Sequence, residues 1–431
     1  MKMKYLLAVC TAFFLASCSN EDEPQQPQPQ HGDIVGLNIK DAKYIYTSGG
    51  NTRSSSSSAE YRQIKKDGRD IELSWIDSKG DTIKIGGQFS IWDINKKYLM
   101  ITTGSPINYK PVISEDGMLE VVEKLGGYSY LINKETEAIY YLGEDQPGLN
   151  GENAVTDNKG NIYVKTNYAQ TIRSPRLYKI HTEDISNLKL ELYADNSQSF
   201  VVNNKGTCFY GYRYIRPSYG TQQFIISSFI PQAEYGNAFV SHDNEDIYIT
   251  AITSSIEERK SSLIVSKLTE DKEIQSEVMA KLSFDGIWQS QTPNYIQVKW
   301  NERRGTMLIH LNRTYEYLVA TKTLTEIPVD LSGFFAADYS IYVTTNALYA
   351  QKSVNKLDII SLEDYSTKTL DLSGKGIDFR SIYTMNGSDL LYFAGFQYSS
   401  SQSVIGTIDI DGNVEITKST PNSITNIIQI N

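Results

Sequence analysis

Few residues in this sequence have the types and spacing that chemistry requires. The four histidines, His31, His181, His242 and His310, are scattered, and no two have the spacing of a metal site. The sequence has no Gly-x-Ser-x-Gly elbow, no phosphate-binding glycine loop and no Cys-x-x-Cys pair. We therefore expect no metal centre, no cofactor and no catalytic residues. Carboxylates are numerous, so a glycosidase-like pair brought together by folding stays an alternative.

The segment 211–220 is the richest candidate for binding a ligand, because tyrosines and arginines alternate along it. The candidate binding residues are Tyr168, Arg173, Arg176, Tyr212, Arg213, Tyr214, Arg216 and Tyr219. Tyrosines and arginines supply flat stacking surfaces and bidentate donors. They suit a glycan that carries carboxylates, a phenolic iron chelate or the hot spot of a partner protein. The alternative is a tyrosine-rich strand with solvated arginines.

The first residues have the features of an exported leader. Lys2 and Lys4 are followed by an apolar run over residues 5–14, and small residues precede Cys18. The apolar run is roughly half of the ~20 residues that a membrane-spanning helix needs. The stretch 15–18, Leu-Ala-Ser-Cys, resembles the lipobox of bacterial lipoproteins. This resemblance implies a signal peptide over residues 1–17 and diacylation of Cys18 as the first residue of the mature chain.

The next segment, residues 18–33, is expected to be a disordered tether, because it is polar and carries three prolines among glutamines. Its acidic cluster over residues 21–23 resembles the surface-export signal of Bacteroidota lipoproteins, and Ser19 resembles an outer-membrane sorting residue. The resemblance implies a lipid-anchored protein of the outer membrane at the cell surface. The periplasmic side of that membrane is the alternative.

Composition narrows the function classes. Cleavage before Cys18 leaves 414 of the 431 residues and, by removing two lysines, changes the formal net charge from −10 to about −12. Such a charge disfavours nucleic acid as a partner, since phosphate binding needs a basic surface. Of the three cysteines, Cys10 leaves with the leader and Cys18 is expected to be lipidated, so no intramolecular disulfide can form. We expect Cys208, in an apolar stretch, to be a buried inert thiol.

A strand–turn–strand pattern recurs through the rest of the chain. Two short strands with alternating apolar residues flank a polar turn that often contains Gly, Asn or Asp. We find it eight times, near residues 34–47, 89–102, 153–165, 199–210, 238–250, 295–310, 333–344 and 381–393. A second stranded stretch follows each copy, so the repeating unit is about four strands. The 30 tyrosines fit this interpretation, because tyrosine is common in strands.

Eight such units predict an all-β body over residues 34–431, formed as a single β-propeller with eight four-stranded blades. In a ring, each blade covers the apolar face of its neighbour, and the strand-like tail at 424–430 would close the ring by pairing with the first blade. Seven blades plus a decorating hairpin is the alternative blade count. Two tandem β-sandwiches and a β-helix are competing folds.

The connections between second and third strands are expected to be long, at 48–70, 103–127, 166–176, 211–223, 251–262, 345–356 and 395–403. In a propeller these connections share one face, and loops on a rigid scaffold often carry function. We therefore expect a surface lipoprotein that binds a ligand or partner protein on this face. By analogy with other Bacteroidota lipoproteins, the partner would be a glycan, an iron chelate or an outer-membrane transporter for nutrient uptake. A glycan-active hydrolase or lyase, and an adhesin or assembly scaffold, are the alternatives.

Overall fold

The computed structural model shows an all-β protein. It describes residues 33–48, 60–85, 89–103, 107–113, 119–125, 129–142, 149–166, 175–195, 199–241, 243–271, 273–286, 297–301, 303–311, 313–327, 341–384, 388–424 and 426–430. These residues form strands and a few short 3-10 helices, η2 (Ile185–Asn187), η3 (Ile226–Ser228) and η5 (Ser373–Lys375). No helix in this part of the chain is long and apolar enough to cross a membrane.

The described strands form eight four-stranded antiparallel sheets. The first sheet contains β37 (Asn426–Gln429), β2 (Ala42–Ser48), β3 (Glu60–Lys65) and β4 (Asp70–Glu72). The second contains β7 (Phe89–Asp93), β8 (Tyr98–Thr103), β11 (Ser129–Asn133) and β12 (Ile139–Tyr141). The third contains β13 (Leu149–Thr156), β14 (Ile162–Thr166), β15 (Leu177–His181) and β16 (Lys189–Ala194). The fourth contains β17 (Phe200–Val202), β18 (Cys208–Tyr210), β19 (Tyr214–Arg216) and β20 (Phe224–Ile225).

The remaining four sheets follow the same strand order. The fifth contains β21 (Gly236–Val240), β22 (Ile247–Ser255), β23 (Lys260–Glu270) and β24 (Ile274–Asp285). The sixth contains β25 (Gln297–Asn301), β26 (Thr306–His310), β27 (Thr314–Leu318) and β28 (Thr323–Ile327). The seventh contains β29 (Ile341–Val343), β30 (Ala347–Ser353), β31 (Lys356–Ser361) and β32 (Thr367–Asp371). The eighth contains β33 (Ile377–Thr384), β34 (Leu391–Gln397), β35 (Gln402–Ile408) and β36 (Val414–Thr420).

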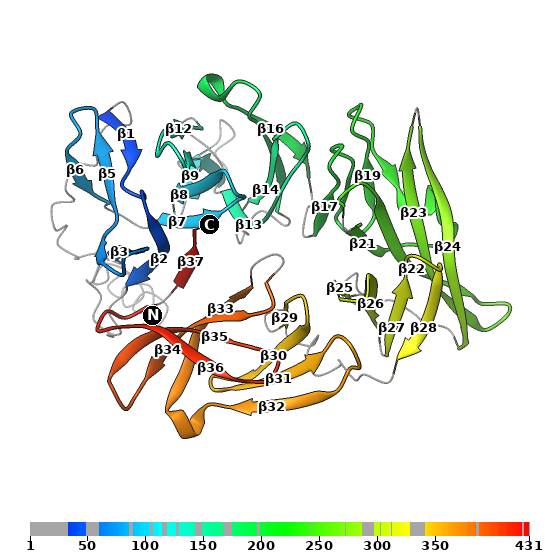
Figure 1. Cartoon of the computed structure of the whole chain (residues 1–431). Helices are drawn as coiled ribbons and strands as arrows, with labels where there is room; N and C mark the ends of the chain where they lie inside the picture. The colour runs from blue at the N-terminus through cyan, green and yellow to red at the C-terminus, as the bar shows by residue number, and fades with distance from the viewer. Residues whose placement is uncertain are drawn as a thin grey trace, which may run out of the picture.

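The sheets follow one another around a common centre in a propeller-like arrangement (Figure 1). The first strand of each sheet is innermost and contacts the first strand of the next sheet, from β7 through β13, β17, β21, β25, β29 and β33. The C-terminal strand β37 contacts both β33 and β7. This arrangement explains the stranded repeat in the sequence, since each sheet buries its apolar faces against two neighbours.

The C-terminal strand completes the first sheet. β37 pairs antiparallel with β2, and Ile428 lies opposite Ile45. The prediction that the tail pairs with the first repeat is therefore confirmed. The predicted hairpin at 34–47 was wrong: β1 (Ile34–Leu37) pairs with β5 (Ser74–Asp77) and not with β2. Because β37 occupies the inner edge of β2, that edge cannot also accept β1.

Two smaller units supplement the eight sheets. β1, β5 and β6 (Thr82–Lys84) form a three-stranded sheet, and β9 (Ile107–Ile113) pairs with β10 (Leu119–Leu125) in a two-stranded one. The three-stranded sheet shares a hydrophobic core with the first and second sheets. In that core the centroid of the Trp75 ring lies 5.4 Å from the centroid of the Tyr130 ring and 6.1 Å from that of the Phe89 ring. The extra sheet therefore fills the space between two neighbouring sheets.

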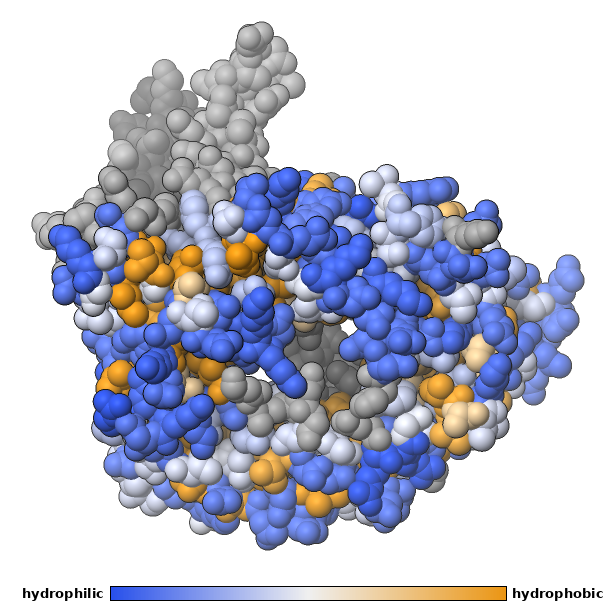
Figure 2. Space-filling view, turned by 45° about the horizontal axis from the view of Figure 1, so that its top comes forward, coloured by the Kyte–Doolittle hydropathy of each residue, from blue (hydrophilic) through white to orange (hydrophobic). Residues whose placement is uncertain are grey.

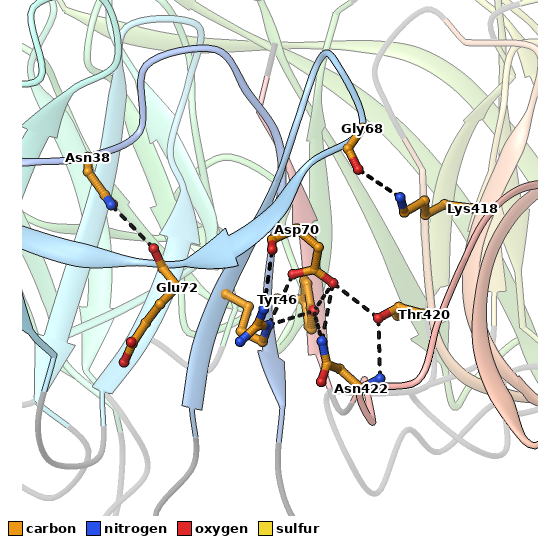
Figure 3. A network of polar contacts seen from close by, with 9 residues as sticks. Asn38, Tyr46, Gly68, Asp70, Glu72, Lys418, Thr420 and Asn422 are labelled. Atoms are coloured by element: carbon orange, nitrogen blue, oxygen red, sulfur yellow. Dashed lines mark hydrogen bonds and ion pairs between the residues drawn. The ribbon is translucent and has the colours of Figure 1, made fainter.

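A polar network joins the first sheet to the eighth (Figure 3). The hydroxyl of Tyr46 donates to Asp70 Oδ2 over 2.7 Å, and Arg62 Nε lies 3.0 Å from Asp70 Oδ1. From the eighth sheet, Thr420 Oγ1 donates to Asp70 Oδ2 over 3.1 Å, and Asn422 Nδ2 lies 3.3 Å from the same oxygen. These contacts connect residues about 350 positions apart in sequence. The Asp70 carboxylate is thus the centre of the seam where the two ends of the chain meet.

The turns between first and second strands also link neighbouring sheets. The backbone N–H of Asn158 donates to the Asn204 carbonyl over 2.7 Å, and the N–H of Asn204 donates to the Asn244 carbonyl over 2.7 Å. Gly160 and Gly206 close two of these turns with φ values of +86° and +96°, which favour glycine. The similar turn sequences near 157–161 and 203–207 therefore reflect a shared geometry that binds one sheet to the next.

The predicted hairpins at 89–102, 153–165, 199–210, 238–250, 295–310 and 381–393 are present as paired first and second strands. The hairpin predicted at 333–344 lies further along the chain, since β29 (Ile341–Val343) pairs with β30 (Ala347–Ser353). Residues 333–340 of that prediction lie outside the described residues. Many tyrosines pack in the sheets as expected, with Tyr163, Tyr210 and Tyr349 almost fully buried.

Several predicted long connections are short. The links between second and third strands span only residues 211–213, 256–259, 354–355 and 398–401, because the flanking strands extend into the segments expected to be loops. The predicted long connections at 211–223, 251–262, 345–356 and 395–403 were therefore wrong. The polar residues of 251–262 belong largely to strands that project beyond the core, where both sides of the strand are exposed to solvent. A projecting polar strand and a loop have similar sequences, so the sequence alone does not distinguish them.

Candidate functional site

The antiparallel order gives the body two faces with different connections. We define face A as the face that carries the second-to-third strand connections and the start of each first strand. Face B carries the first-to-second and third-to-fourth connections. A residue's place in its sheet therefore decides on which face it lies, and this separates the predicted binding residues into two groups.

Four of the predicted binding residues lie on face A. Tyr212 and Arg213 form the turn between β18 and β19, and Tyr214 begins β19. Arg176 directly precedes β15 in the third sheet. Tyr168 and Arg173, also predicted, lie outside the described residues. The structure therefore brings together half of the eight predicted residues at one end of the third and fourth sheets.

Arg216 and Tyr219 lie on face B, so the structure does not bring them together with the other predicted residues. The segment 211–220 had been interpreted as one loop, but β19 (Tyr214–Arg216) crosses the sheet in its middle. Tyr219 follows that strand and is 55% exposed. The physical reason is that three consecutive residues in extended conformation span about 10 Å, which separates Arg213 from the residues after Arg216.

Arg216 instead stabilises the packing of two sheets. It is buried, its guanidinium lies 3.7 Å from the centroid of the Tyr193 ring, and its Nη2 donates to Glu191 Oε1 over 2.9 Å. Glu191 also contacts His181 Nε2 at 2.8 Å. Burial acts to raise the pKa of Glu191, but the hydrogen bonds from His181 and Arg216 outweigh it and hold that pKa below its usual value. The side chains of Arg216, Tyr193, Glu191 and His181 therefore stabilise the packing of the fourth sheet against the third.

Arg213 has a different environment. Its guanidinium carbon lies 5.8 Å from the centroid of the Tyr214 ring and 5.2 Å from that of Tyr235. The Nε atom is buried and has no hydrogen-bond partner within the described residues. Nor does any carboxylate in the described part of the chain form an ion pair with Arg213. The two rings therefore hold a half-buried cation that no described carboxylate neutralises.

A second tyrosine pair adjoins this arginine. The rings of Tyr210 and Tyr214 stack at 5.5 Å across β18 and β19. The Tyr210 hydroxyl is buried and lacks a hydrogen-bond partner among the described residues. Burial raises the pKa of that hydroxyl, so it stays protonated and can donate. In the third sheet, Arg176 Nε lies 3.3 Å from Asp195 Oδ1, so this carboxylate is already paired.

We call Arg213, Tyr210, Tyr214 and Tyr235 the tyrosine–arginine cluster. Sequence reasoning had missed Tyr210 and Tyr235. Tyr235 directly precedes β21, and the N–H of the next residue, Gly236, donates to the Tyr212 carbonyl over 2.8 Å. One signal could have found it: in an antiparallel sheet, the residue before a first strand lies on the same face as a second-to-third turn.

The remaining reactive groups do not form a catalytic arrangement in the described residues. No group of three or more His, Cys, Asp or Glu side chains there could hold a metal ion. Cys208 is fully buried, and burial raises the pKa of its thiol, which keeps it protonated and unreactive. His310 is buried in β26, while His31 and His242 lie outside the described residues.

The molecular surface is hollowed near the centre of the ring. Figure 2 shows this hollow with hydrophilic residues along part of its edge, whereas hydrophobic residues are scattered over the surface in small groups. A hydrophilic surface of this kind favours a polar ligand over an apolar one.

No protein-family model matches the sequence, and no curated protein matches it. Solved structures similar to the chain include the dihydro-heme d1 dehydrogenase NirN in complex with DHE, at 12% identity and a TM-score of 0.42, over 98% of this chain and 86% of that one. A Pyrococcus horikoshii acylaminoacyl peptidase is 12% identical with a TM-score of 0.35, over 77% of this chain and 46% of that one. An oligogalacturonate lyase in complex with manganese is 10% identical with a TM-score of 0.35, over 78% and 85%.

Proposed function

We propose that this chain is a lipid-anchored outer-membrane protein at the cell surface, and that it binds an anionic ligand at the tyrosine–arginine cluster. Its body would be a single propeller with eight blades. Eight four-stranded sheets, inner strands that contact in sequence order, and the pairing of β37 with β2 support that count. In this interpretation the three-stranded sheet and the β9–β10 hairpin are additions to the blades.

One observation carries the binding proposal: a half-buried guanidinium that contacts two tyrosine rings and forms no ion pair with the described residues. A cation that no carboxylate neutralises attracts an anionic ligand, and a charge-assisted hydrogen bond to such a ligand contributes roughly 1.5–3 kcal/mol. The planar guanidinium fits a carboxylate or another oxyanion. The Tyr210 ring stacks on Tyr214 and so supports one of the two rings that contact the guanidinium. The ligand is therefore expected to present oxygens with negative charge.

Binding is favoured over catalysis at this cluster. Asp195, which follows the third sheet, is already paired with Arg176, so it is not a free member of an acid–base pair. A hydrolase or lyase needs such a pair or an equivalent base. A surface protein that captures an anionic nutrient for an outer-membrane transporter fits the arrangement.

The soluble fragment 33–431 tests the ligand proposal. Three probes cover the candidate chemistry: a uronic-acid oligosaccharide, a sulfated oligosaccharide and a ferric tris-catecholate chelate. Arg213→Ala is expected to lower the affinity for the bound probe at least tenfold, because a charge-assisted hydrogen bond contributes about 1.5–3 kcal/mol. Isothermal titration calorimetry measures this difference.

Arg313→Ala is the matched control. Arg313 ends the equivalent turn of the sixth sheet, but its Nη1 lies 2.8 Å from Glu326 Oε1. Its removal should leave the affinity unchanged. If none of the three probes binds, or if both variants bind alike, the proposal of an anion site at Arg213 is wrong.

The anchoring proposal rests on Cys18 and is tested separately. Cys18→Ser in the full-length chain should move the protein from the membrane fraction to the soluble fraction, since two acyl chains are needed for stable anchoring. Cys208→Ala removes the other cysteine of the mature chain and should leave the protein in the membrane fraction. Protease treatment of whole cells then reports whether the body lies at the cell surface. Retention of Cys18→Ser in membranes would contradict lipid attachment.

A further inference from the structure

The fifth sheet projects beyond its neighbours on face A. Its strands β22, β23 and β24 have 9, 11 and 12 residues, whereas β18 and β19 of the fourth sheet have 3 each. The long β23–β24 pair is visible in green in Figure 1. The projecting part includes the end of β22, the start of β23 and the end of β24, which pair in register. It forms a three-stranded wall beside the fourth sheet.

One side of this wall faces the fourth sheet. Ala251 and Ile264, which lie opposite each other on β22 and β23, pack in one core with Ile226, Ile230 and Ala233. Side chains alternate along a strand, so residues two positions further out share this side. The next row on the same side is Thr253, Ser262 and Ser283, one residue from each strand.

This hydroxyl row lies immediately beyond the covered part of the wall, next to the tyrosine–arginine cluster. Gly236 pairs with Ala251, and Tyr235, which contacts Arg213, directly precedes it. Tyr235 is therefore level with the residue between Ala251 and Thr253. The Tyr235 ring contacts Arg213 of the fourth sheet, and the hydroxyl row lies slightly further out on the side of the fifth sheet that faces the fourth sheet.

The row offers hydroxyl groups at regular intervals. Neighbouring strands lie about 4.8 Å apart, so three paired residues span roughly 10 Å. Ser262 Oγ and Ser283 Oγ lie 2.9 Å apart and hydrogen-bond to each other, which leaves acceptor positions on both. Ser283 is exposed and Thr253 half-buried. The row after it on the same side contains Ser255, Lys260 and Asp285.

We propose that the ligand is an acidic oligosaccharide of several residues, with a carboxylate at Arg213 and its sugar hydroxyls along Thr253, Ser262 and Ser283. The inference rests on the proposed anion site. A small anion would need only the Arg213 guanidinium. The neutral hydroxyl groups of the protein row instead match the neutral hydroxyl groups along a sugar chain, since each can donate to and accept from the other. Aromatic rings beside the guanidinium supply the stacking surface for a sugar ring. Lys260, one row further out, lies directly opposite Asp285, so that row carries both charges and adds no net attraction for a carboxylate.

The test compares a uronic-acid monosaccharide with the tetrasaccharide of the same sugar, on fragment 33–431. The tetrasaccharide is expected to bind at least tenfold more tightly. The double variant Thr253→Val and Ser283→Ala should weaken tetrasaccharide binding about tenfold, because two hydrogen bonds are lost. The affinity for the monosaccharide should stay unchanged. Ser254→Ala is the control, because Ser254 is on the opposite side of the same strand and bonds to Ser261. It should change neither affinity.

The outcomes separate this inference from the proposed function. If Arg213→Ala has no effect on either sugar, the anion site itself is wrong. If Arg213→Ala weakens binding but the monosaccharide and tetrasaccharide bind equally, only the oligosaccharide inference is overturned. The same holds if the double variant binds the tetrasaccharide as the parent does, or if ferric tris-catecholate binds at Arg213 while neither sugar does. Circular dichroism of each variant checks that the sheets are intact.

Discussion

Arg213 and Tyr235 belong to consecutive sheets, and the Arg213 guanidinium lies 5.2 Å from the centroid of the Tyr235 ring. The contact therefore crosses the boundary between the fourth and fifth sheets. It places a cation, two aromatic rings and the adjoining wall of the fifth sheet on one face of the molecule. The relationship depends on the ring arrangement, since 21 residues separate Arg213 from Tyr235 in the chain.

Removing the Tyr235 ring should weaken ligand binding without unfolding the protein. Tyr235→Leu removes one of the two rings that hold Arg213, and a partly exposed cation–π contact contributes about 0.5–2 kcal/mol. We expect the affinity for an anionic ligand to fall roughly two- to thirtyfold. Tyr235→Phe keeps the ring and should retain most of the affinity. Equal affinities of the leucine variant and the parent in calorimetric titrations would show that the ring does not position the guanidinium.

The seam between the first and eighth sheets should be sensitive to a single charge. Asp70→Asn keeps the shape of the side chain but removes its charge and replaces one of the two acceptor oxygens, which bind Tyr46 and Arg62, by an NH2 donor. The expected loss in the free energy of unfolding is roughly 1–3 kcal/mol, because partly buried donors lose a charged acceptor. Asp67→Asn is the control, since its pair with Arg69 is exposed and contributes little. Urea unfolding measures both, and equal midpoints would contradict the role given to Asp70.

Close packing within the eighth sheet makes one glycine hard to replace. A Cβ at Gly406 would lie 2.5 Å from the Glu415 carbonyl oxygen and 2.8 Å from the Phe393 ring. Gly406→Ala should therefore lower the free energy of unfolding by about 1–3 kcal/mol. A Cβ at Gly374 meets nothing within 4 Å, so Gly374→Ala should be neutral or slightly stabilising. Thermal unfolding of the two variants checks the prediction; a larger loss for Gly374→Ala would refute it.

Stability should fall above pH 10. Burial, with hydrogen bonding and charge repulsion from Asp70, raises the pKa of Tyr46 to about 12, and burial raises that of Tyr317 to about 12. In the unfolded chain tyrosine loses its proton near pH 10. Each raised pKa therefore stabilises the folded state fully below pH 10, and this contribution is lost as pH rises from 10 to about 12. The loss is about 1.4 kcal/mol per pH unit for each such group.

The measurement is the urea midpoint at several pH values between 9 and 12. Tyr46→Phe should reduce the pH dependence, because the phenylalanine ring has no proton to lose. A midpoint that stays constant over this range would mean that these tyrosines ionise equally in the folded and unfolded states.

The sequence by itself determined the strand-rich class, the approximate repeat and the pairing of the C-terminal tail. These follow from local features: alternation of apolar residues, as in Ile162 and Val164, and turns that contain glycine with positive φ, as at Gly160. The leader and Cys18 are also local signals, although they lie outside the described residues. Arg213 and Tyr214 were recognised for the same reason, since they are neighbours in the chain.

Only the tertiary structure decided which residues share a face and a partner. Arg216 is three positions from Arg213, yet it packs on Tyr193 and Glu191 toward face B, because the strand between the two arginines crosses the sheet. Tyr235 joins Arg213 because two sheets pack side by side, and β1 pairs with β5 because β37 fills the edge of β2. Contacts between sheets depend on ring geometry and long-range pairing, which one-dimensional periodicity does not encode.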